Sequence, residues 1–353
     1  MAHLKLSGLS KKFGNNVALD GLSLDIAEGE FFVLLGPTGA GKSTTLRAIA
    51  GLEKMDQGTI EIGEKNVDGW SAAERDVALV FQYYSLYPRY TVYENMAFPL
   101  RAPIRSLSED EIKARITKAA KTLRIEHLLD RKTDRLSGGE MQRVSIGRAI
   151  VREPQAFLMD EPLSNLDAKL RESLRSELKS LQMSLGATFL FVTHDQIEAM
   201  SMGDRVGVMK EGHIVQVGTP YDIYNNPNSV FVAGFVGSPA INLLPAELSS
   251  GKLQVLDGSV AATAAAKGPK GEVTLGVRSE DVILGAKQPF SAKIHDVENH
   301  GVEKIVTLRS GKQLLRANVA ASTPTPFESD VKFGFRPGKI HCFDRHTGQR
   351  LTL

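Results

Sequence analysis

The sequence predicts an α/β domain followed by a smaller all-β domain. Short apolar segments alternate with helical segments over the first part of the chain, a pattern typical of a sheet covered by helices. A glycine-rich loop, residues 36–44, joins one of these apolar segments to a helix. Beyond about Phe235, short strand candidates follow one another with Gly, Pro and polar turns between them, which indicates a small all-β barrel.

The glycine-rich loop fits the pattern G-x-x-x-x-G-K-[S/T] without a gap. It consists of Gly36, Pro37, Thr38, Gly39, Ala40, Gly41, Lys42, Ser43 and Thr44. The apolar stretch Glu30–Leu35 before it is typical of a buried strand, and a helix is expected from Ser43 to Ala50. This context favours a phosphate-binding loop over a tight turn that only happens to be rich in glycine.

The chemistry of the loop supports the same prediction. Its glycines let backbone N–H groups converge on phosphate oxygens at the positive end of a helix. Lys42 supplies a cation for the outer phosphates, and the Ser43 hydroxyl is placed to ligate Mg²⁺. We therefore expect a triphosphate with its magnesium ion to bind here.

Length and composition limit the other possibilities. A chain of 353 residues suggests two or three domains, and a formal net charge of +2 shows no general preference for polyanions. Cys342 is the single cysteine, which excludes an internal disulfide framework and a Cys-rich zinc site. The N-terminal residues lack the apolar core of a signal peptide, and no apolar run approaches the roughly 20 residues that span a bilayer. A cytoplasmic protein is expected, unless a membrane partner recruits it.

The segment before the phosphate loop should form two strands. Leu4–Leu9 and Val17–Ile26 alternate loosely, and residues 14–16 between them are a turn signal. Phe13 stands directly before that turn. Its ring could stack on a nucleotide base or could be an ordinary core side chain.

Two further strand candidates, Gly58–Ile62 and Val77–Phe81, come after the first helix, and Gln82 follows the second of them. The stretch Tyr83–Tyr90 contains four tyrosines, which suit an interface because they present apolar area with a polar tip. The alternative is a loop that packs on its own domain. From Thr91 to Arg131 the pattern becomes helical, with a capping box at Ser108–Glu111.

The remaining elements of the first domain alternate between helix and buried strand. A glycine turn at 136–140 opens a helix that ends near Pro154, and a long helix carries leucines from Leu166 to Leu181 on one face. Strands are expected at Ala156–Met159, Thr188–Val192, Arg205–Met209 and His213–Val217.

In the second domain, strands are expected at Glu272–Val277, Phe290–Val297, Val302–Leu308, Gln313–Ala317, Val331–Phe335 and Lys339–Phe343. Residues 261–271 are low in complexity and predict a loop. Because residues from 236 onward include no Tyr or Trp, a nucleic-acid-binding barrel with stacking platforms is disfavoured.

Acidic and polar residues follow the expected strands at one sheet edge. Asp160 and Glu161 end a buried strand, where such sheets bind ligands beside a phosphate loop. Asp160 can hold Mg²⁺ through its water shell, and Glu161 can orient or deprotonate a water molecule. The alternative is an acidic pair that caps a helix. Gln82 and His194 each follow a strand that should end at this edge. Gln82 could reach the γ-phosphate through Mg²⁺ or water, and His194 could reach it directly. A single histidine at a strand end is, however, more often structural.

Ser137, Gly138 and Gly139 form a second glycine turn at a helix N-terminus, which predicts a second anion site. A chain with one phosphate loop needs only one phosphate cradle. If this second site does not reach the chain's own nucleotide, it must serve the nucleotide of another subunit.

Taken in order, these motifs resemble the ATP-binding cassette of ABC transporters over roughly residues 1–235. The motifs are G-P-T-G-A-G-K-S-T, the Gln82 loop, L-S-G-G-E-M-Q-R, F-L-M-D-E-P, S-N-L-D at Ser164–Asp167, and T-H-D at His194. The blocks F-Q-Y-Y-S-L-Y-P and E-P-L-S-N-L-D-A-K-L-R, with the tail after G-S-P-A-I-N, resemble the ATPase subunits of carbohydrate importers, similar to those for maltose and glycerol-3-phosphate.

This resemblance implies the architecture of the chain. It implies a P-loop NTPase fold with a RecA-like core in residues 1–235, a helical subdomain at about 84–154, and an OB-like (TOBE) regulatory domain in residues 236–353. Two copies would face each other head to tail, with each ATP and its Mg²⁺ between one phosphate loop and the other copy's Ser137–Gly139. Glu140 and Asp167 would also lie among the nucleotide contacts.

The same resemblance implies roles and partners. Glu161 would be the catalytic base, His194 the γ-phosphate sensor, and Phe13 the adenine-stacking residue. Residues 82–90 would dock two membrane-spanning permease subunits at the cytoplasmic face of a bacterial inner membrane, in a system with an extracytoplasmic solute-binding protein and no nucleic acid. Two departures stand out: Glu140 replaces the commoner Gln and adds negative charge near the partner's nucleotide, and Phe13 replaces the commoner Tyr or Trp.

Other functions of the cassette remain as alternatives. One is a soluble ABC ATPase that acts on DNA or ribosomes. Ribosome-acting types usually carry two cassettes, whereas this chain has one phosphate loop. DNA-repair types carry a long coiled coil between the phosphate loop and the signature, whereas fewer than 100 residues separate Thr44 from Leu136 here. Another is the ATPase of a different ABC transporter class, for which a C-terminal barrel would be unusual. We therefore expect an ATP-hydrolysing subunit that powers import of a sugar or sugar-like solute.

Overall fold

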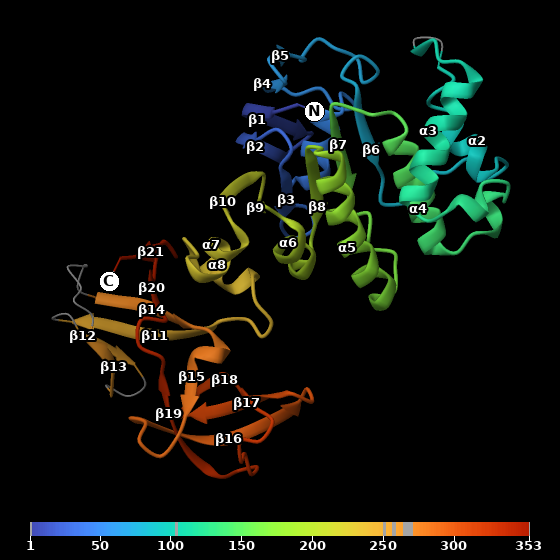
Figure 1. Cartoon of the computed structure of the whole chain (residues 1–353). Helices are drawn as coiled ribbons and strands as arrows, with labels where there is room; N and C mark the ends of the chain where they lie inside the picture. The colour runs from blue at the N-terminus through green and yellow to red at the C-terminus, as the bar shows by residue number, and fades with distance from the viewer. Residues whose placement is uncertain (1, 103–104, 250–251, 256–258, 264–270, 353) are drawn as a thin grey trace. The chain divides into compact units, whose positions relative to one another are not determined.

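The computed structural model describes residues 2–102, 105–249, 252–255, 259–263 and 271–352. The chain forms two compact units, Met1–Pro220 and Tyr221–Leu353 (Figure 1). The expected boundary between residues 235 and 236 therefore falls inside the second unit. None of the helices in the described ranges is both long and apolar enough to cross a membrane.

A six-stranded sheet forms the centre of the first unit, in the order β10-β9-β3-β8-β7-β6. Its strands are β3 (Phe31–Leu35), β6 (Val77–Val80), β7 (Ala156–Asp160), β8 (Phe189–Thr193), β9 (Arg205–Lys210) and β10 (His213–Gly218). Neighbouring strands from β9 to β6 run parallel, and only β10 is antiparallel. Every side chain of β3 and β8 is buried, as expected for apolar runs covered on both faces.

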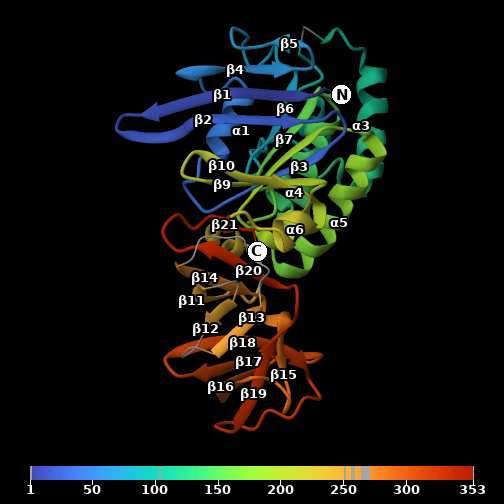
Figure 2. The same cartoon turned by 90° about the vertical axis from the view of Figure 1, so that its left-hand side faces the viewer.

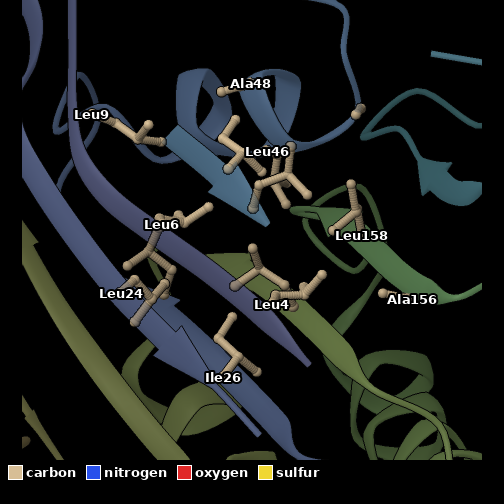
Figure 3. Packing of buried hydrophobic residues seen from close by; sticks show 14 of the residues in the cluster. Leu4, Leu6, Leu9, Leu24, Ile26, Leu46, Ala48, Ala156 and Leu158 are labelled. Atoms are coloured by element: carbon tan, nitrogen blue, oxygen red, sulfur yellow. The ribbon is translucent and has the colours of Figure 1, made fainter. Parts of the chain in front are cut away.

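A second, antiparallel sheet lies against the first and has the order β2-β1-β4-β5. It comprises β1 (Leu4–Phe13), β2 (Asn16–Ile26), β4 (Gln57–Ile62) and β5 (Lys65–Asn66), and Figure 2 shows β1, β2 and β4 side by side. The helix α1 (Lys42–Ile49) completes the layer between the sheets. Figure 3 shows this apolar core, to which these elements and β7 contribute Leu4, Leu6, Leu9, Leu24, Ile26, Leu46, Ala48, Ala156 and Leu158.

The remaining helices of the first unit form two groups. The helices α2 (Val92–Ala97), α3 (Glu109–Thr122) and α4 (Gly138–Ile150) lie together in Figure 1, joined by 3-10 turns at Glu126–Leu128 and Thr133–Arg135. Each of the three begins with a complete capping box, including the one predicted at Ser108–Glu111. The helices α5 (Ala168–Leu185) and α6 (Gln196–Met202) flank β8, and Gly186 ends α5 in the left-handed conformation.

The second unit begins with two short helices and continues as two antiparallel sheets. The helices are α7 (Pro220–Asn225) and α8 (Val230–Phe235). The six-stranded sheet contains β11 (Asn242–Ser249), β12 (Lys252–Val255), β13 (Ser259–Thr263), β14 (Gly271–Val277), β20 (Ile340–Asp344) and β21 (Arg350–Leu351). The five-stranded sheet contains β15 (Val282–Leu284), β16 (Phe290–Asn299), β17 (Glu303–Ser310), β18 (Gln313–Ala320) and β19 (Asp330–Phe335). Side chains from both sheets share one apolar core.

The sequence analysis predicted six of these strands and missed others. It named no strand at β11, β12, β13, β15 or β21, and no helix at α7 or α8. Pro245 inside β11 and the short length of the other strands weaken the alternating pattern on which strand prediction depends. The loop expected at 261–271 is in part wrong, because residues 261–263 belong to β13; residues 264–270 lie outside the described residues.

Arg278 attaches the two short helices to the sheets of the second unit. Its guanidinium group donates to the carbonyl oxygens of Ala233 and Val236 at the end of α8, and to that of Tyr224 in α7. The group lies 4.1 Å from the centre of the Tyr224 ring, and the Tyr224 hydroxyl donates to Glu280 at 2.6 Å. This buried side chain thus connects both helices to the end of β14, beside the backbone hydrogen bond from Val230 to Gly348 and the apolar contacts of Ala233 with Ile241 and Phe343.

Candidate active site

Four parallel strands of the central sheet deliver polar residues to one edge. The phosphate loop follows β3, Gln82 follows β6, Glu161 follows β7 and His194 follows β8. Their carboxyl ends meet around a cavity of about 510 Å³. Its lining residues are Phe13, Asn16, Ala18, Thr38, Gly39, Gly41, Lys42, Ser43, Thr44, Gln82, Glu161 and His194. Residues far apart in the sequence are thus gathered in one hollow of the first unit.

Two glycines of the phosphate loop are required by close packing. A Cβ atom on Gly41 would lie 2.4 Å from the carbonyl oxygen of Ala18, and the φ angle of Gly41 is +103°. A Cβ atom on Gly36 would lie 2.5 Å from the carbonyl oxygen of Met209. The loop therefore packs backbone against backbone, which leaves its N–H groups available to a phosphate at the start of α1.

The ammonium group of Lys42 lies inside this loop. Its Nζ donates to the carbonyl oxygens of Gly36 and Pro37 at 2.8 and 2.9 Å, and lies 3.7 Å from Oε1 of Glu161. The Lys42 side chain is 5% exposed, and burial lowers its pKa, while the nearby carboxylates of Glu161 and Asp160 oppose that shift. A polyanion in the cavity would add negative charge beside this buried cation and favour its charged form further.

Ser43 and Asp160 form a pair of oxygen ligands beside the loop. The Ser43 hydroxyl donates to Oδ1 of Asp160 at 2.8 Å. Burial raises the pKa of Asp160, and the hydrogen bond from Ser43 opposes this. Hard oxygen ligands of this kind fit Mg²⁺, which is usually held by one or two carboxylates together with substrate phosphates. Within the described ranges there is no cluster of three or more His, Cys, Asp or Glu residues that could hold a metal alone.

Glu161 and His194 are in direct contact across two strand ends. Nδ1 of His194 and Oε2 of Glu161 are 2.8 Å apart, which is hydrogen-bond distance. The Glu161 side chain is 17% exposed, and its backbone adopts a φ angle of +45°, which is uncommon for a residue other than glycine. Such strained residues cluster at active sites. The pair faces the phosphate loop, where a carboxylate could accept a proton from water.

Phe13 contributes an aromatic ring to the lining of the cavity. Phe13 is 47% exposed, and Nζ of Lys11 lies 5.1 Å from the centre of its ring. Asn16 pairs with Phe13 in the antiparallel register of β1 and β2, and both line the cavity with Ala18. The sequence analysis missed Asn16 and Ala18 as cavity residues, although the predicted turn at 14–16 placed Asn16 close to Phe13.

The second glycine turn does not line this cavity. Ser137 is exposed, and it caps α4: its N–H and Oγ donate to Oε2 of Glu140 at 2.7 and 2.8 Å. These bonds lower the pKa of Glu140. A Cβ atom on Gly139 would lie 2.3 Å from Leu170, so this glycine also lets α4 pack against the start of α5. The start of α4 thus lies outside the chain's own cavity, with Ser137 exposed and Gly138 and Glu140 partly exposed.

Gln82 and Asp167 are tied to the turn between β7 and α5. Nε2 of Gln82 donates to Oγ of Ser164 at 3.2 Å, and Nδ2 of Asn165 donates to the carbonyl oxygen of Gln82 at 2.9 Å. Asp167 caps α5 by accepting from the N–H of Leu170 at 3.0 Å. Gln82 therefore lines the cavity, whereas Asp167 is exposed and lies outside it.

Comparison with known protein families agrees with this arrangement. A family model described as ABC transporter matches residues 19–164, and one described as MalK OB fold domain matches residues 237–282. The sn-glycerol-3-phosphate import ATP-binding protein UgpC of Rhizobium meliloti is 47% identical over 99% of this chain and its own full length. The sulfoquinovosyl glycerol transport ATP-binding protein SmoE of Agrobacterium fabrum is 45% identical over the same shares. The xylose/arabinose import ATP-binding protein XacK of Haloferax volcanii is 45% identical over 99% of this chain and 96% of its own.

Solved structures show the same fold for the first part of the chain. CbiO1 from Clostridium perfringens, part of the ABC transporter complex cbiONQ, matches with a TM-score of 0.58 and 33% identity over 62% of this chain and 89% of its own. The ATP-binding cassette MJ0796, solved as a dimer bound to ADP and phosphate, matches with a TM-score of 0.55 and 34% identity over 62% and 98%. The chain belongs to the family of ABC transporter ATP-binding proteins, with a P-loop ATPase cassette followed by a MalK-type OB-fold domain.

Proposed function

We propose that this protein is the ATP-hydrolysing subunit that powers uptake of a sugar or a sugar-like solute through an ABC importer. The observation that carries the proposal is the cavity, which brings the phosphate loop, Gln82, Glu161 and His194 together. Relatives that match over the full length of the chain are named for import or transport of glycerol-3-phosphate, sulfoquinovosyl glycerol and xylose or arabinose. This favours an importer over a cassette that acts on DNA or ribosomes.

Each residue of the cavity has its own role in the reaction. The loop N–H groups and Lys42 bind the β- and γ-phosphates, and Phe13 stacks on the adenine ring. The Glu161 carboxylate accepts a proton from the attacking water, and His194 holds that carboxylate and contacts the γ-phosphate. Ser43, Asp160 and Gln82 would hold Mg²⁺, which when bound neutralises part of the phosphate charge.

A second copy of the chain completes the site. Ser137, Gly138 and Gly139 lie outside the chain's own cavity at the N-terminus of a 13-residue helix, where a phosphate would be stabilised. Asp167 is exposed at the start of α5 and Glu140 is partly exposed in the first turn of α4, and both would contact the partner's nucleotide. The dimeric solved cassettes support an assembly of two copies.

The tyrosine-rich stretch would dock the permease subunits at the cytoplasmic face of the inner membrane. Tyr83 is 74% exposed, and the rings of Tyr87, Tyr90 and Phe98 contact one another, with Tyr87 and Phe98 4.5 Å apart. Tyr84 differs: burial raises the pKa of its hydroxyl, and that hydroxyl lies beside Gly138. Tyr83 and Tyr87 are therefore the better contact residues for a membrane partner.

Solute uptake by cells that depend on this chain tests the proposal. A chromosomal copy with an affinity tag should co-purify two membrane-spanning proteins, and uptake of one sugar-like solute should stop in the Lys42→Ala strain. Tyr83→Glu should release the membrane proteins while the purified chain binds ATP as tightly as before. Normal uptake of all sugars and polyol phosphates by the Lys42→Ala strain would refute the importer assignment.

A further inference from the structure

Arg171, in the first turn of α5, lies between two turns of the active site. Its Nη2 donates to the carbonyl oxygens of Leu166 and Ser164 at 3.1 and 3.5 Å, and its Nη1 donates to Oδ2 of Asp195 at 3.3 Å. One guanidinium group thus contacts the turn 161–167 after β7 and the turn 193–195 after β8. Its rigid fork of donors suits it to hold groups from two directions.

The first of these turns carries the proposed catalytic base. The Ser164 hydroxyl donates to the carbonyl oxygen of Glu161 at 2.9 Å and accepts from Nε2 of Gln82 at 3.2 Å. The Ser164 N–H also donates to the Glu161 carbonyl, at 3.2 Å. A shift of this turn would therefore move both Glu161 and Gln82 relative to the phosphate loop.

The second turn carries His194 between two anchored neighbours. The Thr193 hydroxyl donates to Oε2 of Glu198 at 2.6 Å and accepts from the Asp195 N–H at 2.9 Å. Asp195 caps α6 by accepting from the Ile197 N–H at 2.7 Å. Because His194 lies between Thr193 and Asp195, its contact with Glu161 depends on where this turn sits relative to the turn after β7.

Arg171 has an unused donor close to the helix that follows the second turn. Its Nε atom is buried, makes no hydrogen bond within the described part of the chain, and lies 4.0 Å from Oε1 of Glu198. Glu198 is 2% exposed; burial raises its pKa, and Arg171 and Arg175 oppose the shift. The Arg171 guanidinium group thus also lies close to Glu198, which accepts from the Thr193 hydroxyl directly before His194.

We propose that Arg171 is a positioning residue for ATP hydrolysis, which keeps Glu161 and His194 paired by tying their two turns together. It touches neither the phosphate loop nor Phe13, so it acts on the chemical step and leaves nucleotide binding to those residues. This role rests on the proposed functions of Glu161 and His194. A misplacement of about 1 Å from a residue outside the reacting groups can lower a rate by roughly a hundredfold.

Steady-state ATP hydrolysis by the full-length chain tests the proposal. Arg171→Ala should lower kcat by about ten- to a hundredfold, while KM for ATP stays within about twofold, since only positioning for the chemical step is lost. Millimolar guanidinium should restore part of the lost kcat in Arg171→Ala, which a merely structural loss would not allow. Arg175→Ala is the matched control: it removes a charge that also acts on Glu198 but has no part in the bridge, so its kcat should stay near that of the wild type.

The outcomes separate this proposal from its rivals. If Arg171→Ala hydrolyses ATP at the wild-type rate, or if Arg175→Ala loses as much activity, Arg171 does not position the pair. If Arg171→Ala does not fold, Arg171→Lys decides: it keeps the charge, but a single ammonium cannot reach both turns, so kcat should still fall, and a wild-type kcat overturns the proposal. A wild-type chain that does not hydrolyse ATP, alone or with its membrane partners, would instead refute the proposed function.

Discussion

The ammonium group of Lys42 is a buried cation that contacts both neutral carbonyl groups and a carboxylate. Two loop carbonyls accept hydrogen bonds from it, and Glu161 lies within 4 Å. Burial favours its neutral form, whereas the carboxylates of Glu161 and Asp160 favour the charged form. An arriving triphosphate meets this cation together with the two carboxylates, so Lys42 offsets part of the negative charge that repels the phosphates.

Lys42→Ala should abolish hydrolysis and weaken ATP binding. The change leaves Glu161 and Asp160 facing the phosphates without their cation, and a hydrogen bond to a charged group contributes about 1.5–3 kcal/mol, or roughly 10- to 150-fold in affinity. Calorimetric titration with ATP and a phosphate-release assay measure the two effects. Lys54→Ala, at an exposed position outside the cavity, is the control and should bind normally. Near-normal turnover of Lys42→Ala would contradict the assignment of the loop.

Individual residues also show where the sequence analysis stopped short. The pattern Ser-x-x-Glu predicted a capping box at Ser108–Glu111, and the same pattern at Ser137–Glu140 was interpreted only as an anion site. Glu140 was expected to add charge near the partner's nucleotide; in the structure its carboxylate is bonded to Ser137 and lies 3.8 Å from Arg131. The charge is thus partly compensated within the chain.

At the scale of elements, prediction succeeded where the signal is local. Buried strands such as Ala156–Asp160 and Phe189–Thr193 are apolar runs with turn residues at both ends, so each can be recognised from its own sequence. The helices α7 and α8 could not be recognised from the sequence, because six-residue helices are not stable alone and depend on packing. Their packing depends on distant residues such as Arg278 and Phe343, more than forty residues later in the chain. The contacts of Arg171 with Ser164, Leu166 and Asp195 were not predicted either, because they depend on how separate segments pack in the fold.

Arg278→Met should destabilise the second unit and release α7 and α8. The change leaves the carbonyls of Ala233, Val236 and Tyr224 without their donor, and each buried unpaired acceptor costs about 1–3 kcal/mol. Pulse proteolysis in urea, with fragments identified by mass spectrometry, should show a loss of at least about 2 kcal/mol, with early cleavage near residues 221–236. Arg345→Met removes an exposed ion pair with Glu272 and should cost less than about 1 kcal/mol. Equal losses in the two variants would mean that Arg278 is not the anchor.

His341, on β20, should make the second unit sensitive to acid. It is 8% exposed, its Nδ1 makes no hydrogen bond within the described residues, and burial lowers its pKa to about 4. Because the folded pKa lies below the unfolded value of about 6.5, the stability is complete above pH 6.5 and falls as the pH drops toward 4. The same urea assay should show a loss of about 2 kcal/mol between pH 7 and pH 5. In His341→Leu this loss should disappear; an unchanged loss would assign it to other groups.

At the scale of the whole molecule, the chain carries a cavity and an open helix start that do not meet within one copy. The cavity holds Glu161 and His194, while Ser137–Gly139 lie outside it. The sequence could predict the phosphate loop and the second glycine turn, because each is a contiguous motif, and the proposal that they join across two copies follows from their separation. A nucleotide between them would hold two chains together and stabilise the dimer by mass action.

Glu161→Gln should trap that dimer. The change keeps the size of the side chain and its hydrogen bonding but removes proton acceptance, so turnover should fall by about 10²- to 10⁴-fold. ATP affinity should not fall, since a negative charge near the γ-phosphate is removed. Light scattering should therefore show a dimer with Mg-ATP and a monomer with ADP. Hydrolysis by Glu161→Gln at the wild-type rate would assign the base to another residue, with His194 the next candidate.

Adding Ser137→Arg to Glu161→Gln tests whether the helix start of one copy serves the cavity of the other. The bulky side chain fills the anion site, so the double variant should bind ATP at its own phosphate loop and remain a monomer. Because Ser137 is also a helix cap, the control is Glu161→Gln with Ser108→Arg, which removes an equivalent capping box from α3. Each substitution costs about 1 kcal/mol of helix stability, so any difference in dimerisation comes from the place of the cap in the fold. The Ser108 control should dimerise with Mg-ATP as Glu161→Gln does. Dimerisation of the Ser137 variant to the same extent would show that α4 does not contact the partner's nucleotide.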